Sequence, residues 1–347
     1  MMIKLERRNE IKEIVLQTLL HSNLPHLPVN IKKICKSFEY IRVIPFSVQM
    51  KHRNMTFDEV YKQCESEDAC ADFYAKSGKY IIYYNDVTKW KYITSNRYRW
   101  SLAHELGHIL LKHHIQYNKT RIFRCALSDE EYNYLEEEAD YFAQLILVPH
   151  AALLGFRIDS PKNIRIMCKI SESAAKRRYY QYMEWKRHVD AQDEYDRRIF
   201  YFYFDFIFKR QCKNCGASLV QRHGKYCPIC GEKNTLQWGD GKMIYPKLDS
   251  YENGKIKICP VCQNEETNIE GTYCQICGHT LANYCTNYDC SNGNELPTNA
   301  RYCPICGSAS TFFNAGYLKK WNYKDPLEGL FLDTNNNDEI DEELPFA

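Results

Sequence analysis

The sequence lacks an excess of charge of either sign, and it lacks a long hydrophobic run. Its 46 Lys and Arg residues nearly balance 44 Asp and Glu residues, which leaves a formal charge of +2. No global charge therefore draws the chain to nucleic acid or to an acidic membrane surface. The longest strongly apolar stretch, 199–208, is shorter than a membrane span and contains Asp205. We expect no transmembrane segment.

Residues 1–20 also lack the uninterrupted apolar core of a signal peptide. Charged residues recur every few positions among them. The apolar residues between these charges are Ile3, Ile11, Ile14, Val15 and Leu19. This pattern predicts an amphipathic helix at the start of the chain.

The chain has 347 residues, which is long enough for two or three domains, and its hydrophobic content of 44% is enough to form their cores. Up to about residue 190, helical and strand patterns alternate, with a helix predicted at 30–37 and strands at 41–46 and 80–85. From 212 to 306, short polar segments separate close pairs of cysteines. The character of the chain therefore changes near residue 200.

Residues 97–114, RYRWSLAHELGHILLKHH, contain an HExxH string. His104 and His108 are four residues apart, so on a helix both imidazoles lie on one face and can reach one metal ion. Helix-forming residues at 100–111, with an apolar side, predict such a helix and its burial. Glu105 follows the first histidine, as in zinc proteases of the HExxH type.

A catalytic zinc site needs a third protein ligand and one position left for water. His114 stands where the HExxHxxGxxH pattern has its last histidine, but Leu111 occupies the glycine position at which the chain leaves the helix. We therefore expect the helix to continue, with His113 and His114 as ordinary residues of its last turn. The other source of a third ligand is the segment 128–149.

Residues 128–149, SDEEYNYLEEEADYFAQLILVP, are predicted to form a second helix. Ser128 and Glu131 are spaced as a capping box, and Pro149 ends the segment. An apolar stripe runs along it through Leu135, Ala139, Phe142 and Ile146.

The acidic residues of this second helix are predicted to differ in role. Glu136 and Asp140 share one face, which suits a carboxylate ligand followed by a residue that orients an imidazole. Glu137 and Glu138 are expected to point elsewhere, into solvent.

Together the two segments resemble the ImmA/IrrE family of zinc metallopeptidases. The resemblance lies in RYRWSLAHELGHILLKH followed by EEEADYFAQLILVP, and covers about residues 8–185. It implies an α+β fold, a thermolysin-like (gluzincin) minimal metallopeptidase domain with a small antiparallel sheet. As substrate it implies a helix-turn-helix transcriptional repressor of a mobile element or of a stress or defence operon.

The resemblance also implies roles for individual residues. His104, His108 and Glu136 would bind the catalytic zinc, and Asp140 would orient a ligand histidine. Such a zinc lowers the pKa of its water toward about 7, and Glu105 would act as general base. Three residues are candidates for stabilising the oxyanion: Tyr98, Arg99 and His150.

Residues 162–185 are compatible with a helix-turn-helix, which the resemblance also suggests. Ser171 or Ser173 would cap its second helix. Three basic residues would then lie near DNA phosphates: Lys176, Arg177 and Arg178. Because three bases make a weak patch, the sequence favours the alternative, in which these helices pack on the peptidase and shape its substrate cleft.

Twelve of the 17 cysteines form six close pairs. These pairs are Cys212/Cys215, Cys227/Cys230, Cys259/Cys262, Cys274/Cys277, Cys285/Cys290 and Cys303/Cys306. Gaps of 11, 11 and 12 residues group them into three units, each with four thiolates that can surround one zinc ion and exclude water. We predict three structural zinc ribbons that fold only when zinc binds. Because thiolates must stay reduced to bind zinc, we also predict a reducing, cytoplasmic location. The other cysteines are predicted to be buried or incidental: Cys35, Cys64, Cys70, Cys125 and Cys168.

The predicted organisation combines these parts, with one catalytic and three structural zinc ions. The boundaries are a metallopeptidase domain at 1–150, a helical segment at 151–190, a linker at 191–211, ribbons at 212–235, 255–280 and 281–312, and an acidic tail at 325–347. The leading hypothesis is a zinc endopeptidase that cuts a protein. The alternative is a non-catalytic zinc-binding regulator whose ribbons bind nucleic acid or protein, through residues such as Arg222 and Tyr226.

Overall fold

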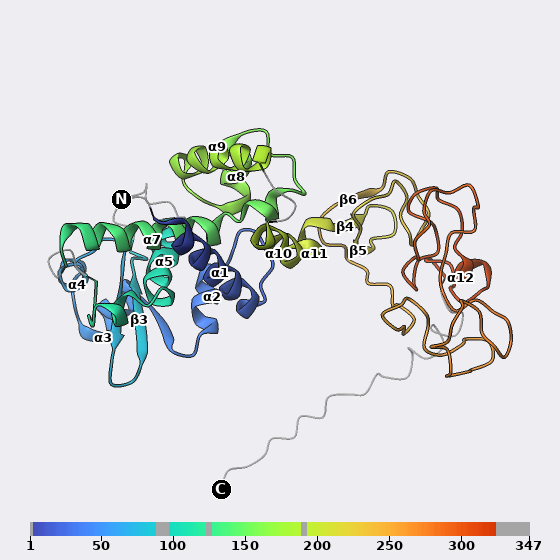
Figure 1. Cartoon of the computed structure of the whole chain (residues 1–347), viewed down its shortest axis with the longest axis horizontal. Coiled ribbons are helices and arrows are strands. Elements are labelled where there is room, and N and C mark those ends of the chain that lie inside the picture. The colour runs from blue at the N-terminus through green and yellow to red at the C-terminus, as the bar shows by residue number, and fades with distance from the viewer. Residues whose placement is uncertain (1–2, 88–96, 123–126, 189–192, 324–347) are drawn as a thin grey trace, which may run out of the picture. The chain divides into compact units, whose positions relative to one another are not determined.

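The computed structural model describes residues 3–87, 97–122, 127–188 and 193–323. The chain divides into two compact units, Met1–Ile207 and Phe208–Ala347 (Figure 1). The predicted tail at 325–347 and Cys125 lie outside the described residues. No helix in the described residues is long and apolar enough to cross a membrane.

The first unit contains a three-stranded sheet in the order β1-β3-β2. Its strands are β1 (Ile41–Pro45), β2 (Ala69–Tyr74) and β3 (Lys79–Tyr84). β2 is antiparallel to β3, but β1 is parallel to it, so the expectation of a wholly antiparallel sheet was wrong in this detail. The parallel pairing is possible because α3 (Phe46–Arg53), α4 (Phe57–Cys64) and β2 return the chain before β3 begins.

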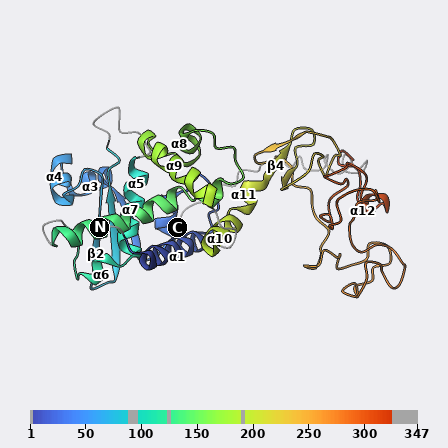
Figure 2. The ribbon, with the colours of Figure 1, turned by 45° about the horizontal axis from the view of Figure 1, so that its top comes forward.

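Helix α5 (Arg97–Leu110) contacts the sheet on one side and α7 (Asp129–Leu147) on the other (Figure 2). α7 begins at the predicted capping box, in which the Glu131 N–H donates to Ser128 Oγ at 3.2 Å. Its predicted stripe, from Leu135 to Ile146, is buried. The two helices that carry the HExxH and ExxAD strings are therefore packed side by side.

The N-terminal helix α1 (Leu5–Ser22) packs against α7, α2 (Ile31–Ser37) and α10 (Glu194–Phe202). Three of its predicted apolar positions, Ile11, Val15 and Leu19, are completely buried, which confirms the amphipathic helix. The segment predicted as a linker carries α10, α11 (Phe204–Phe208) and the start of β4.

Two further helices follow the short η2 (His150–Leu153): α8 (Pro161–Cys168) and α9 (Glu172–His188). Ser171 Oγ accepts from the Ala174 N–H at 3.3 Å, as predicted for a cap. Arg178, one of the three bases that the helix-turn-helix alternative would place near DNA, is buried, and its side chain donates to the Val148 carbonyl at 2.9 Å. Burial of one of the three bases supports packing of these helices on the peptidase.

In residues 208–323, the described part of the second unit, there is little regular structure beyond a sheet of β4 (Lys209–Cys212), β5 (Ser218–Val220) and β6 (Leu236–Trp238), and the helix α12 (Thr311–Asn314). Cysteines lie at the centre of its apolar clusters. One cluster joins four of them to Ala217 and Ile229, and another joins Cys259 and Cys274 to Phe312. Cores this small need an additional source of folding free energy.

Candidate active site and metal centres

Close packing of α5 on α7 brings the predicted ligands together. Gly107 makes this approach possible, because a Cβ atom at that position would lie 3.2 Å from the Cα atom of Ala139. His104 and His108 lie about one turn apart on α5, and Glu136 lies about one turn before Ala139 on α7, so their ligand atoms come together where the two helices touch. The helix contact therefore determines where the three side chains meet.

The ligand atoms of these three residues form a compact triangle. The Nε2 atoms of His104 and His108 are 3.1 Å apart, and they lie 3.2 and 3.3 Å from the two carboxylate oxygens of Glu136. Three ligands bound to one tetrahedral ion through bonds of about 2.0–2.1 Å would be about 3.3 Å from one another. The triangle therefore has the dimensions of three corners of a metal site.

Asp140 lies where the sequence placed it. Its Oδ1 atom is 3.0 Å from Nδ1 of His104. A hydrogen on Nδ1 that is donated to this carboxylate leaves the lone pair of Nε2 for a metal ion.

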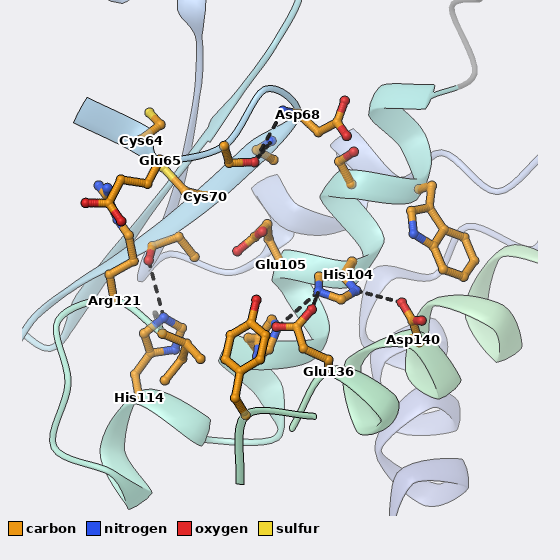
Figure 3. Close-up of a pocket in the computed structure, with 18 residues that line it drawn as sticks. Cys64, Glu65, Asp68, Cys70, His104, Glu105, His114, Arg121, Glu136 and Asp140 are labelled. Atoms are coloured by element: carbon orange, nitrogen blue, oxygen red, sulfur yellow. Dashed lines mark hydrogen bonds and ion pairs between the residues drawn. The ribbon is translucent and has the colours of Figure 1, made fainter. Parts of the chain in front are cut away.

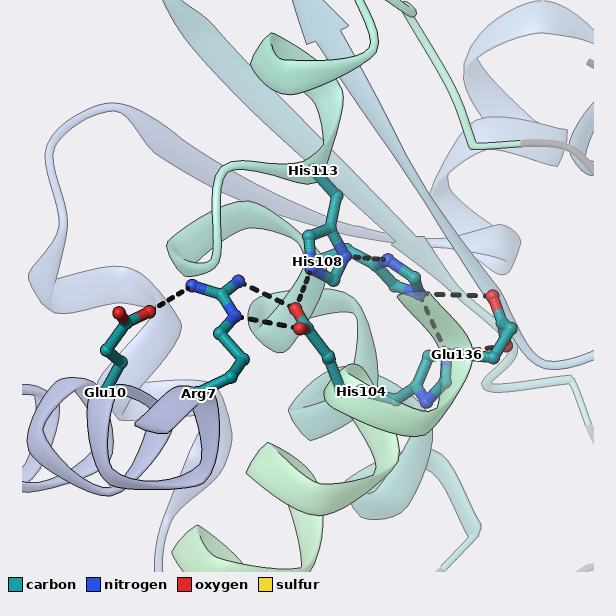
Figure 4. Close-up of polar contacts among 7 residues, drawn as sticks. Arg7, Glu10, His104, His108, His113 and Glu136 are labelled. Carbon is teal, nitrogen blue, oxygen red and sulfur yellow. Dashed lines mark hydrogen bonds and ion pairs between the residues drawn. The ribbon is translucent and has the colours of Figure 1, made fainter. Parts of the chain in front are cut away.

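His108 has a support that the sequence analysis missed. Its Nδ1 atom lies 2.9 Å from Nδ1 of His113, whose Nε2 atom lies 3.0 Å from Glu138 (Figure 4). The expectations that α5 continues past Leu111 and that Glu138 is solvated were both wrong. α5 ends at Leu110, and Lys112 adopts φ 62° before α6 (His113–Gln116), which turns His113 inward.

Glu105 lies beside the triangle and lines the same pocket (Figure 3). Burial raises the pKa of its carboxyl group to about 7, while the charge of His104 and a hydrogen bond from the Ala71 backbone oppose the rise. The ordinary pKa of a glutamate side chain is 4.5. A carboxyl group with a pKa near neutrality can both accept and release a proton.

The two imidazoles have opposite electrostatic environments. Burial disfavours protonation of His104, but Asp140 and Glu136 outweigh it and raise the pKa to about 10. Burial lowers the pKa of His108 to about 3. Burial favours a raised pKa for Glu136, but the neighbouring rings of His104 and His108 outweigh it and hold the pKa below its usual range. An ionised carboxylate next to a neutral imidazole is a donor set that suits a divalent cation.

The pocket has a volume of about 590 Å³ and gives the triangle access to solvent. Tyr98, Arg99 and His150 do not line it: Tyr98 packs against Tyr84, and Arg99 donates to the Cys168 carbonyl. Polar side chains that do line it include those of Tyr132, His114 and Arg121. The sequence did not indicate Tyr132 or Arg121, and it raised His114 only as a possible metal ligand, because each reaches the pocket through the tertiary fold.

The second unit brings the twelve paired cysteines into the three predicted groups of four. Within each group, the closest sulfur atoms are 3.4–3.7 Å apart. A disulfide would require about 2.05 Å, whereas sulfurs bound tetrahedrally to zinc at about 2.3 Å are about 3.8 Å apart. Gly231, Gly278 and Gly307 have φ of 78°, 73° and 81°, which suits the tight turn after each second pair. The three clusters fit zinc ribbons.

Fold and site together describe an α+β domain that carries the triangle of His104, His108 and Glu136, followed by three clusters of four cysteines. Residues 67–179 match the family model described as the IrrE N-terminal-like domain, a peptidase family, which confirms the resemblance for this part of the chain. Helix α1 and the cysteine clusters lie outside the matched residues. A comparison with curated proteins found no match.

Proposed function

We propose that this protein is a zinc-dependent endopeptidase that cleaves a protein substrate. The observation that carries the proposal is the triangle of His104, His108 and Glu136, which opens on a pocket beside Glu105. A structural site would be closed by a fourth protein ligand, as the cysteine clusters are. In the described residues the triangle has three ligands, and the pocket leaves room for water and a peptide.

A zinc ion held by these three residues would supply Lewis-acid activation of water and of the scissile carbonyl. Glu105 takes the proton of the attacking water and delivers it to the leaving amine. Asp140 keeps His104 in the tautomer that leaves Nε2 free. Tyr132, His114 and Arg121 line the pocket and are the candidates for stabilising the oxyanion; Arg121 also pairs with Asp72, and His114 also contacts the Ala71 carbonyl.

The proposed substrate is a helix-turn-helix transcriptional repressor of a mobile element or of a stress or defence operon, as the family resemblance implies. We further propose that the ribbons bind the substrate or a nucleic acid that presents it. Twelve thiolates that must stay reduced to bind zinc favour a cytoplasmic location.

Cleavage of a co-expressed repressor tests the proposal. A helix-turn-helix repressor encoded beside this protein should be cut by the wild type and remain intact with Glu105→Gln, a variant that keeps the shape of the side chain. Glu137→Gln, on the neighbouring helix, should cleave like the wild type and serves as the matched control. Equal cleavage by wild type and Glu105→Gln would exclude Glu105 as the base. A protein that binds zinc fully but cuts no repressor would favour the non-catalytic regulator.

A further inference from the structure

A buried chain of hydrogen bonds runs from the metal triangle to the N-terminal helix (Figure 4). It starts at His108 and passes through His113 to Glu138. Glu138 in turn accepts two hydrogen bonds from Arg7 of α1, at 2.8 and 2.7 Å. His108, His113 and Glu138 are 3%, 0% and 1% exposed, so water does not compete for these contacts.

We propose that His113 and Glu138, anchored by Arg7, are positioning residues that hold His108 in its metal-binding tautomer. The inference rests on the metal centre of the proposed function. It also makes α1, which lies outside the residues matched by the family model, a component of that centre.

The donors and acceptors of this chain leave one consistent arrangement. Arg7 can only donate, and an ionised Glu138 can only accept. Nε2 of His113 must then carry a hydrogen, which leaves Nδ1 of a neutral His113 as an acceptor. Nδ1 of His108 supplies the hydrogen for the 2.9 Å contact, so that Nε2 of His108 keeps its lone pair toward the triangle.

The ion pair of Arg7 with Glu138 gives this arrangement its direction. A buried carboxylate without a cationic partner is costly, so Arg7 stabilises the acceptor that His113 needs. Without that acceptor, nothing would hold the hydrogen of His113 on Nε2, and a hydrogen on Nδ1 of His113 would point toward Nδ1 of His108. His108 would then carry its hydrogen on Nε2, where it blocks coordination.

Glu138→Gln tests the role of the carboxylate directly. Oε2 of Glu138 accepts from both Arg7 and His113, and Oε1 accepts from Arg7 alone. The glutamine has one acceptor oxygen and no charge for these three donors, so His113 loses the ionised acceptor that holds its hydrogen on Nε2. We expect zinc affinity at the three-ligand site to fall at least about tenfold, measured in the full chain by competition with chelators that leave the ribbons loaded. In the metal-free site, ¹⁵N shifts of labelled histidine should show more of the His108 hydrogen on Nε2 than in the wild type.

Two further variants make the test decisive. Glu10→Gln is the matched control, because Glu10 also accepts from Arg7, at 2.9 Å, but is 61% exposed; its zinc affinity should stay within about twofold of wild type. Arg7→Gln should weaken binding in the same direction as Glu138→Gln. Because Arg7 is 25% exposed, this variant can be used if Glu138→Gln does not fold.

A folded Glu138→Gln with wild-type zinc affinity and an unchanged His108 tautomer would overturn the proposal and leave only a structural ion pair. If Glu138→Gln does not fold, wild-type affinity in Arg7→Gln would overturn it. These readouts do not depend on peptide cleavage. A protein that behaves as expected here but cuts no repressor would contradict the proposed function and not this inference.

Discussion

At the scale of single residues, each ring at the metal centre is oriented through the nitrogen that faces away from it. Asp140 holds His104 from a position on α7 that is 48% exposed, whereas His113 holds His108 from a position with no exposure. Asp140 can exchange its hydrogen bond with His104 for one with water, whereas the buried His113 cannot exchange its hydrogen bond with His108. The metal centre is therefore adaptable on the Asp140 side and fixed on the His113 side.

Another buried histidine should make the stability of the first unit depend on pH. His150 packs against Tyr182 and Trp185, and burial lowers its pKa well below the ordinary value of 6.5. The unfolded chain thus binds a proton that the folded chain does not. The contribution of neutral His150 to the stability of the first unit is therefore complete above about pH 6.5 and declines as the pH falls below this value.

The His150→Phe variant removes this dependence. As the pH falls below 6.5, the free energy of unfolding of the variant should rise relative to that of the wild type by up to about 1.4 kcal/mol for each pH unit. Urea unfolding at pH 8 and pH 5, with chelator present in both, measures this change. His52→Gln, at an exposed position of α3, is the control and should follow the wild type. A constant difference between His150→Phe and wild type across this range would show that His150 takes up its proton equally in the folded and unfolded states.

At the scale of elements, the metal centre depends on the distance between α5 and α7. A Cβ atom on Gly107 would lie 3.2 Å from the Ala139 Cα atom and 3.3 Å from its carbonyl oxygen. Backbone atoms cannot move aside as a flexible side chain does. A side chain at residue 107 would therefore press against the backbone of α7.

Gly107→Ala should destabilise the first unit although alanine is the better helix former. We expect the overpacking cost, about 1–3 kcal/mol, to exceed the helix-propensity gain of about 1 kcal/mol. Zinc affinity should fall as well, because Glu136 moves away from the histidines with α7. Denaturant unfolding and chelator competition measure the two effects. Gly293→Ala, where a Cβ meets no atom within 4 Å, should change neither, and an unchanged Gly107→Ala would show that the interface can relax.

Local patterns predicted those elements whose signals lie within a few residues. The capping box at Ser128, the HExxH spacing and the cysteine pairs were all visible in this way. β2 was not predicted, because its sequence ACADFY is buried on both faces near its start and shows no alternation. The end of α5 was predicted wrongly. The turn at Lys112 buries His113 against the pair of Glu138 and Arg7, and these two residues are 131 positions apart in the sequence, beyond the reach of a local pattern.

At the scale of the whole molecule, the two units should respond differently to loss of metal. The first unit has an extensive apolar core that includes Leu16, Leu102 and Phe142, whereas the cores of the second unit are built around its cysteines. Zinc binding therefore contributes much of the folding free energy of the second unit and little of that of the first.

Strong chelators should therefore unfold the second unit and leave the first folded. Limited proteolysis of the full chain with chelator should destroy residues after about 208 and leave a resistant fragment that ends near 207, the boundary of the first unit. With zinc present, both units should resist. Equal protection of the cysteine-rich unit with and without chelator would show that it folds without metal.

The central claim is that His104, His108 and Glu136 hold one ion whose remaining position is open to the pocket beside Glu105. An anomalous-difference map collected at the zinc absorption edge, on crystals of the zinc-loaded protein, tests it most directly. The account predicts a peak within about 2.0–2.2 Å of both Nε2 atoms and a Glu136 oxygen, with a water that bridges the ion and Glu105. A map without a peak at this position, or with a protein side chain as its fourth ligand, would contradict the account.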